Sequence, residues 1–246
     1  MSKHRKILLS NKIPLILAPI VGAKTATALV MVKTGSKYEK KEESGLSHFL
    51  EHMFFKGTDK RPDTLSLSAE LDALGGEYNA FTSKEYTGYY VKTAAGKLGQ
   101  ALEILGDMLS NSKFDAVEIE REKGVIIEEL NMYEDNPIMH VEDVLESCLY
   151  GDTPAGRDTI GTKKNIRAFK RSDFLRYFRR QYGAHSIFVI LSGSIRPADK
   201  AAAAKIFGIF PINTWRNKIA VKEKQEQPLL KIVNKKTDQI NLALAL

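Results

Sequence analysis

The order of strand-like and helix-like segments is the feature that most constrains the fold of this chain. Two short apolar segments, residues 6–9 and 13–18, flank Ser10-Asn11-Lys12 and predict a hairpin of two strands. Helical and strand-like segments then follow one another without the regular β-α-β alternation that builds a parallel sheet. The sequence therefore predicts an α+β fold in which helices pack on a mainly antiparallel sheet.

The spacing of apolar residues locates the individual elements. Strands are expected over residues 25–33, 78–82, 86–93 and 186–191. Helices are expected from Leu46 to a point before Gly57, with Ser44 or Ser47 as the cap, and over residues 66–74, 97–110, 115–133, 139–149, 172–180 and 196–207. Asn136-Pro137 interrupts the helical pattern and predicts a break between the helices over residues 115–133 and 139–149.

A change in composition near Thr214 predicts a domain boundary. Residues 214–227 are polar and charged, which is typical of a linker between domains. Two more strands are expected beyond it, over residues 229–233 and 240–246. We therefore expect a first domain over residues 1–213, a linker over 214–227, and the beginning of a second domain, truncated, over 228–246.

The formal net charge of +7 is unevenly distributed. Residues 163–180 hold eight Lys and Arg residues against one Asp, whereas residues 101–150 hold thirteen Asp and Glu residues against three basic ones. The basic segment has no interleaved stacking aromatics and no zinc-finger or P-loop spacing. It is therefore interpreted as a solvated helix face, and no nucleic-acid partner is expected.

Targeting and redox signals are weak. Cys148 is the only cysteine, so the chain cannot form a disulfide framework of its own. Basic residues near the N-terminus precede apolar ones, but Asn11 and Lys12 interrupt the run, so no signal peptide is predicted. No run of about 18 apolar residues occurs, and no membrane partner is expected. The predicted location is cytoplasmic.

A short motif, His48-Phe49-Leu50-Glu51-His52, carries the clearest chemistry. On a helix His48 and His52 lie on one face, so both imidazoles can bind one ion at about 2.0 to 2.1 Å. Glu51 shares that face with His48, and a carboxylate there can accept a proton from water without binding the metal. The motif predicts a metal site that still needs a third protein ligand.

Candidates for the third ligand lie in the acidic block. In the predicted helix over residues 115–133, Glu122 and Glu129 are seven residues apart and share a face with Val125 and Ile126. Charged residues in an apolar stripe are costly unless they are paired or bound to a metal. The alternative for Glu122 is a salt-bridged surface residue.

The sequence around this motif resembles a known family. Residues 45–58, Gly-Leu-Ser-His-Phe-Leu-Glu-His-Met-Phe-Phe-Lys-Gly-Thr, are similar to the signature of the M16 peptidases, the pitrilysin and mitochondrial processing peptidase family. Residues 75–82 and 122–130 extend the resemblance in the same order, and it continues to Gly161. The resemblance implies an M16 lobe, an α+β fold like that of LuxS and the processing peptidases, and a zinc-dependent endopeptidase.

The resemblance also implies a role for each matching position. One zinc ion per chain would be bound by His48, His52 and Glu129, with Glu51 as the catalytic base. Glu122 would support the ligands from behind. An extended substrate would add to the edge strand at Asn79, Ala80 and Phe81.

The partners implied by the resemblance are a substrate and a second lobe. The substrate would be a peptide or an unfolded polypeptide, hydrolysed by metal-activated water. Family members combine two related lobes, so the second lobe would come in cis or in trans, and in trans it would give a homodimer or heterodimer. Two alternatives stay open: a non-catalytic binding or assembly subunit, and a fragment that is inactive without the second lobe.

Overall fold

The computed structural model describes residues 4–213, 215–221, 225–236 and 238–245. Within them the chain forms a six-stranded sheet in the order β1-β2-β6-β3-β5-β4. The β2–β6 pair is parallel, and the other four neighbouring pairs are antiparallel. This confirms the predicted mainly antiparallel sheet. The strands are β1 (Arg5–Leu8), β2 (Pro14–Pro19), β3 (Thr25–Val32), β4 (Glu77–Thr82), β5 (Thr87–Ala94) and β6 (Ile187–Gly193).

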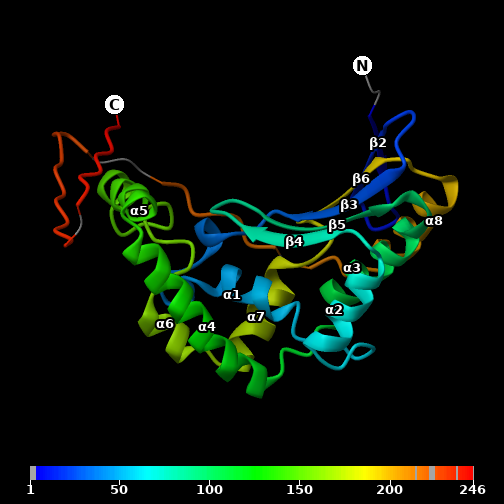
Figure 1. Cartoon of the computed structure of the whole chain (residues 1–246), viewed down its shortest axis with the longest axis horizontal. Helices are drawn as coiled ribbons and strands as arrows, with labels where there is room; N and C mark the ends of the chain where they lie inside the picture. Colours follow the sequence, from blue (N-terminus) through cyan, green and yellow to red (C-terminus); the bar gives the residue numbers. More distant parts are fainter. Residues whose placement is uncertain (1–3, 214, 222–224, 237, 246) are drawn as a thin grey trace.

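Helices lie beneath one face of this sheet (Figure 1). The helix α6 was not predicted by apolar spacing; Thr162 caps it by accepting a hydrogen bond from the Asn165 backbone N–H at 3.2 Å. The helices are α1 (Leu46–Met53), α2 (Thr64–Ala73), α3 (Leu98–Asn111), α4 (Ala116–Asp135), α5 (Pro137–Tyr150), α6 (Lys163–Ala168), α7 (Arg171–Gln181) and α8 (Pro197–Phe207), with short 3₁₀ turns at Ser36–Tyr38, Lys41–Glu43 and Ala95–Lys97.

The core lies between the sheet and the helices. Along β3, buried and half-buried residues alternate, which is the pattern of a strand with one face on the core. On α1, Phe49 and Leu50 are completely buried, and just after it the Phe54 ring stands edge-on to Tyr89 at 5.3 Å between centroids. Because one side of α1 is anchored in the core, its opposite side is held in a fixed position.

Helices α4 and α5 form a wall beside α1 at one end of the sheet (Figure 1). Asn136 ends α4 and begins α5, because its side chain accepts hydrogen bonds from the backbone N–H groups of Ile138 and Met139. Pro137 occupies the first position of α5, where its missing N–H costs nothing. The predicted break at Asn136-Pro137 is therefore confirmed.

The two strands predicted after the linker are not formed. Residues 229–233 and 240–245 have no regular secondary structure, and residue 246 lies outside the described range. Leu230 and Ile240 are 83% and 99% exposed, and no described strand pairs with either segment. An apolar segment becomes a strand only when a neighbouring strand satisfies its backbone N–H and C=O groups. The prediction of two strands, which rested on the apolar pattern alone, is therefore wrong for these segments.

Part of the predicted linker contacts the rest of the chain. Trp215 donates from its indole Nε1 to the Lys33 carbonyl oxygen at 3.1 Å, and Lys218 pairs with Glu85 at 2.7 Å. Thr214 and residues 222–224 lie outside the described residues, so the boundary at 214 stays a prediction. Among the described residues, no helix is both long and apolar enough to cross a membrane.

Candidate metal centre

The start of α1 is fixed by a glycine and a buried carboxylate. Gly45 has φ 97°, and no serine side chain caps the helix, so the predicted serine cap is wrong. The Glu39 carboxylate instead accepts hydrogen bonds from the backbone N–H groups of Gly45 at 2.8 Å and Ser47 at 2.6 Å. Burial raises the pKa of Glu39 to about 8, against these two donors, which favour the ionised form. Together these contacts set the position of His48.

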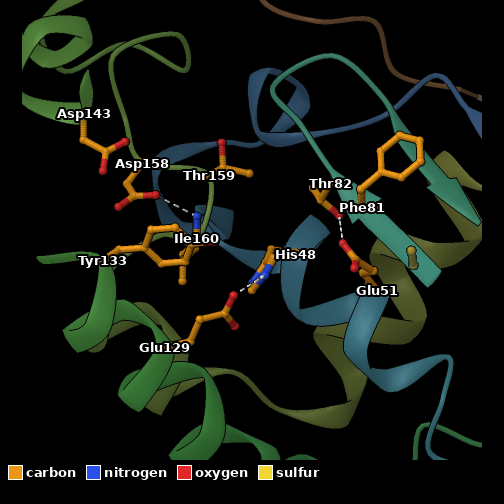
Figure 2. Close-up of a pocket in the computed structure, with 11 residues that line it drawn as sticks. His48, Glu51, Phe81, Thr82, Glu129, Tyr133, Asp143, Asp158, Thr159 and Ile160 are labelled. Atoms are coloured by element: carbon orange, nitrogen blue, oxygen red, sulfur yellow. Dashed lines mark hydrogen bonds and ion pairs between the residues drawn. The ribbon is translucent and has the colours of Figure 1, made fainter. Parts of the chain in front are cut away.

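The side chains of His48, His52 and Glu129 converge on one point. Figure 2 shows two of them, His48 and Glu129. Nε2 of His48 lies 3.6 Å from Oε1 of Glu129, and Nε2 of His52 lies 3.5 Å from Oε2 of the same carboxylate. Each of the three residues has a ligand atom within 4.8 Å of the others. The structure therefore brings together the two motif histidines and the glutamate that the resemblance selected, although they come from α1 and α4.

These distances fit a tetrahedral zinc ion. Ligand atoms about 2.0 to 2.1 Å from such an ion lie about 3.4 Å from one another, close to the observed separations between nitrogen and oxygen. Two imidazoles and one carboxylate form a donor set typical of catalytic zinc, which keeps one position open. The nearby His48 imidazole holds the pKa of the Glu129 carboxyl group below its ordinary value, so this carboxylate is ionised near neutral pH and can bind a metal.

Glu122 stands behind His52. Its Oε1 lies 2.9 Å from Nδ1 of His52, and its Oε2 lies 2.6 Å from Nζ of Lys56. Burial raises the pKa of Glu122, but the hydrogen bonds from His52 and Lys56 outweigh it and hold the pKa below its ordinary value. An ionised Glu122 only accepts, so His52 donates from Nδ1 and turns a free lone pair at Nε2 toward the site. Glu122 is thus buried rather than a surface residue, whereas Val125 is 52% exposed and does not share its buried face.

Glu51 lies beside the three candidate metal ligands and contacts the edge strand β4. The hydroxyl of Thr82 on β4 donates to Oε2 of Glu51 (Figure 2). Burial raises the pKa of Glu51, and the Thr82 hydrogen bond opposes that rise in part. A desolvated carboxylate with a raised pKa is suited to accept and return a proton at neutral pH.

The cleft has a volume of about 350 Å³, and β4 forms one of its sides. Strand β4 is at the end of the sheet order, so one of its edges has no partner among the described strands. Ala80 and Phe81 line the cleft together with Thr82. Asn79, the other predicted substrate residue, is exposed on β4 and is not among the lining residues. The contact of Thr82 with Glu51 was missed by sequence reasoning, although the two-residue period of a strand places Thr82 on the same face as Ala80.

The opposite side of the cleft carries two more acidic residues that sequence reasoning missed. Asp143 comes from α5 and Asp158 from the loop before α6 (Figure 2). Burial, with repulsion from Asp158 and Glu146, raises the pKa of Asp143 to about 6. The turn at Pro137 breaks the helical spacing from Glu129 to Asp143, so no pattern in the sequence joined them. The cleft therefore holds more negative charge than the metal ligands alone provide.

Comparison with known proteins gives the M16 peptidase family, the same family that the sequence motifs resemble. Residues 17–163 match the family model described as insulinase, peptidase family M16. The chain is 37% identical over 216 residues to the uncharacterized zinc protease YmxG of Bacillus subtilis, covering 87% of this chain and 52% of that protein. It is 39% identical over 184 residues to the human mitochondrial-processing peptidase subunit beta, covering 75% of this chain and 37% of that protein.

Solved structures share the fold. A protease from Helicobacter pylori superposes with a TM-score of 0.85 at 23% identity, covering 91% of this chain and 55% of that one. The periplasmic protease PqqL from Escherichia coli superposes with a TM-score of 0.82 at 23% identity, covering 91% of this chain and 26% of that one. The chain thus spans about half, or less, of the length of the proteins it resembles.

Proposed function

Because this chain belongs to the insulinase family of M16 peptidases, we propose that it is a zinc-dependent endopeptidase whose zinc ion is held by His48, His52 and Glu129. The observation that carries the proposal is the convergence of two imidazole nitrogens on one carboxylate at 3.5 and 3.6 Å. Zinc in such a site supplies Lewis acidity and lowers the pKa of water to about 7.

Glu51 is the general base in this proposal. Its carboxylate accepts a proton from the attacking water and returns that proton to the leaving amine nitrogen. Three features support this role: Glu51 lines the cleft, burial raises the pKa of its carboxyl group, and Thr82 holds one of its oxygens. Because Thr82 occupies Oε2, Oε1 is the oxygen left for the proton.

The proposed substrate is an extended peptide or unfolded polypeptide that adds to the outer edge of β4. Backbone groups on the outer edge of the segment over Asn79, Ala80 and Phe81 would hydrogen-bond to it as another antiparallel strand would. The Ala80 N–H, which donates to the Asn79 side-chain oxygen at 2.9 Å, would be released to the substrate. Support comes from the place of β4 at the end of the sheet and from Ala80 and Phe81 in the cleft lining. Backbone pairing of this kind binds many sequences, so side-chain preference has to come from the opposite wall.

That wall favours a basic substrate side chain near the scissile bond. Burial raises the pKa of both Asp143 and Asp158, and repulsion from Asp158 adds to the rise at Asp143. Lys84 pairs with Glu146 at 2.6 Å, but no ion pair within the described residues neutralises Asp143 or Asp158. A Lys or Arg side chain would relieve their repulsion and form charge-assisted hydrogen bonds.

A second candidate is a non-catalytic subunit that binds substrate or assists assembly. The chain spans only 37% to 52% of the two curated relatives described above, one of which is named as a subunit, so a second lobe in cis or in trans is part of the proposal. In trans, that lobe would make a homodimer or heterodimer. The complete set of metal and base residues favours the catalytic candidate.

Cleavage of an unstructured peptide by zinc-loaded protein separates these candidates. We expect time-dependent cleavage, and Glu51→Gln should lower the rate by at least about a hundredfold while zinc remains bound. A matched control is Glu128→Gln, which alters an exposed glutamate on α4 and should leave the rate unchanged. Zinc binding without cleavage would support the non-catalytic candidate or a fragment that is inactive without the second lobe. Full turnover by Glu51→Gln would remove Glu51 from the mechanism.

A further inference from the structure

We propose that Lys56 is a positioning residue for the metal site, acting on His52 through Glu122. The inference rests on the proposed role of His52 as a zinc ligand. Nζ of Lys56 lies 2.6 Å from Oε2 of Glu122, whose other oxygen lies 2.9 Å from Nδ1 of His52. Lys56, Glu122 and His52 thus form a continuous chain, with the ammonium at one end and the proposed ligand at the other.

The local backbone explains why Lys56 can reach this position. His52 is in the last turn of α1, and Lys56 follows four residues later in the turn that ends the helix. The Lys56 backbone N–H donates to the Met53 carbonyl oxygen at 3.2 Å, and Gly57 then turns the chain away at φ 110°. Lys56 therefore lies on the same side as His52 and faces α4, which carries Glu122.

Burial makes the contact consequential. The Glu122 side chain is 6% exposed and the Lys56 side chain 21% exposed, so little water is available to replace either partner. A buried carboxylate held at a single oxygen is free to rotate about its terminal torsion, which is broad. With Lys56 on Oε2, that rotation is blocked and Oε1 stays on the imidazole.

The consequence for His52 is a single tautomer in a single orientation. The Glu122 carboxylate only accepts, and Lys56 keeps its Oε1 facing the imidazole, so His52 must donate from Nδ1. The lone pair is then at Nε2, the nitrogen that lies 3.5 Å from Glu129. Without Lys56, Glu122 loses one of its two fixed donors and its carboxylate can turn away from Nδ1, so the imidazole is free to take the other tautomer, with a proton at the metal-binding nitrogen.

The zinc affinity of Lys56→Met tests this inference. Loss of partners behind a metal ligand typically weakens binding by about 10- to 100-fold. We expect Lys56→Met to weaken zinc binding at least about tenfold, measured by competition with a chromophoric chelator, and Lys56→Arg to restore most of the affinity. The matched control is Lys123→Met: Lys123 also has a largely buried side chain, but it pairs with Glu120, away from the ligands.

A second measurement separates positioning from a general loss of structure. In metal-free protein labelled with ¹⁵N at its five histidines, His52 should show the Nδ1–H tautomer alone, and Lys56→Met should show a mixture. Lys56→Gln keeps a neutral donor and should give an intermediate result, which serves if the methionine variant does not fold. Failure of the unmutated chain to bind zinc would overturn the proposed function instead. Unchanged zinc affinity and an unchanged tautomer in Lys56→Met would overturn the role of Lys56.

Discussion

Replacing Gly45 by alanine should disturb both the fold and the metal site, because Gly45 meets two separate constraints. Its φ of 97° lies in the left-handed region, and an added Cβ would lie 2.3 Å from the Ile160 carbonyl oxygen and 3.0 Å from the Gly161 Cα. Gly161 is constrained in the same way, since it has φ 89° and a Cβ added there would lie 2.4 Å from the Ser44 carbonyl oxygen. The contact joins the start of α1 to the loop that forms part of the cleft wall.

The two constraints can be separated by a matched variant. Gly75 also has a left-handed φ, 65°, but a Cβ there meets nothing within 4 Å. Gly75→Ala should therefore show only the cost of the left-handed conformation, about 1 to 2 kcal/mol. Gly45→Ala should show that cost and, in addition, about 1 to 3 kcal/mol for forcing atoms into a packed space. The lower entropy of the unfolded alanine chain affects both variants and cancels in the comparison.

Urea unfolding of the two variants measures the difference, and zinc affinity shows whether it reaches the site. We expect Gly45→Ala to be less stable than Gly75→Ala by at least about 1 kcal/mol. His48 lies three residues after Gly45 in the first turn of α1, so a shift at Gly45 would displace it. Only Gly45→Ala should therefore also weaken zinc binding. Equal stability of the two variants would refute the reasoning, because it would show that the approach of Ile160 imposes no cost.

Three further predictions follow from individual contacts. Burial raises the pKa of Glu39 from 4.5 to about 8, so between these two pH values the folded state keeps a proton that the unfolded state releases. The free energy of unfolding should therefore fall as pH rises from 4.5 to about 8, by up to about 5 kcal/mol. Glu39→Gln should remove that slope in urea unfolding at about pH 5 and about pH 9, and an unchanged slope would contradict the assignment. Thr82→Val should lower kcat roughly tenfold with little change in zinc affinity, and Thr82→Ser should recover it; equal kcat values would show that the hydroxyl does not position Glu51. Asp143→Asn should reduce kcat/KM roughly tenfold for a peptide with arginine near the cleaved bond, and it should leave kcat/KM unchanged for a matched peptide with glutamine at that position. Equal losses of kcat/KM for the two peptides would contradict a role of Asp143 in selectivity.

The parts of the fold that sequence analysis predicted are those specified by local spacing. The helical positions of His48 and His52 and the break at Asn136-Pro137 depend on neighbours within a few residues, and the structure confirms both. The contact between α1 and α4 could not be predicted from local spacing. Spacing within α4 left both Glu122 and Glu129 as candidates for the third metal ligand, and only the resemblance selected Glu129. The structure shows why both are acidic, since one faces the imidazole lone pairs and the other lies behind His52.

The parts that could not be predicted depend on contacts between distant segments. Asp143 and Asp158 line the same cleft as Glu129, but the turn at Pro137 separates them from α4, so no helical periodicity joins them to it. The cap of α1 comes from Glu39 rather than a neighbouring serine, because a loop brings a buried carboxylate to the helix start. The apolar segment over residues 229–233 has the composition of a strand but lacks a partner strand among the described residues.

The zinc content of the purified chain tests the central claim most directly. After dialysis against trace zinc, elemental analysis should find one zinc ion per chain, and the same treatment of Glu129→Gln should leave much less, since Glu129 faces both imidazoles at 3.5 and 3.6 Å. Glu128→Gln, its exposed neighbour, should retain the full amount. Absence of zinc from the unmutated chain, or equal zinc in the Glu129→Gln variant, would contradict a site built from His48, His52 and Glu129.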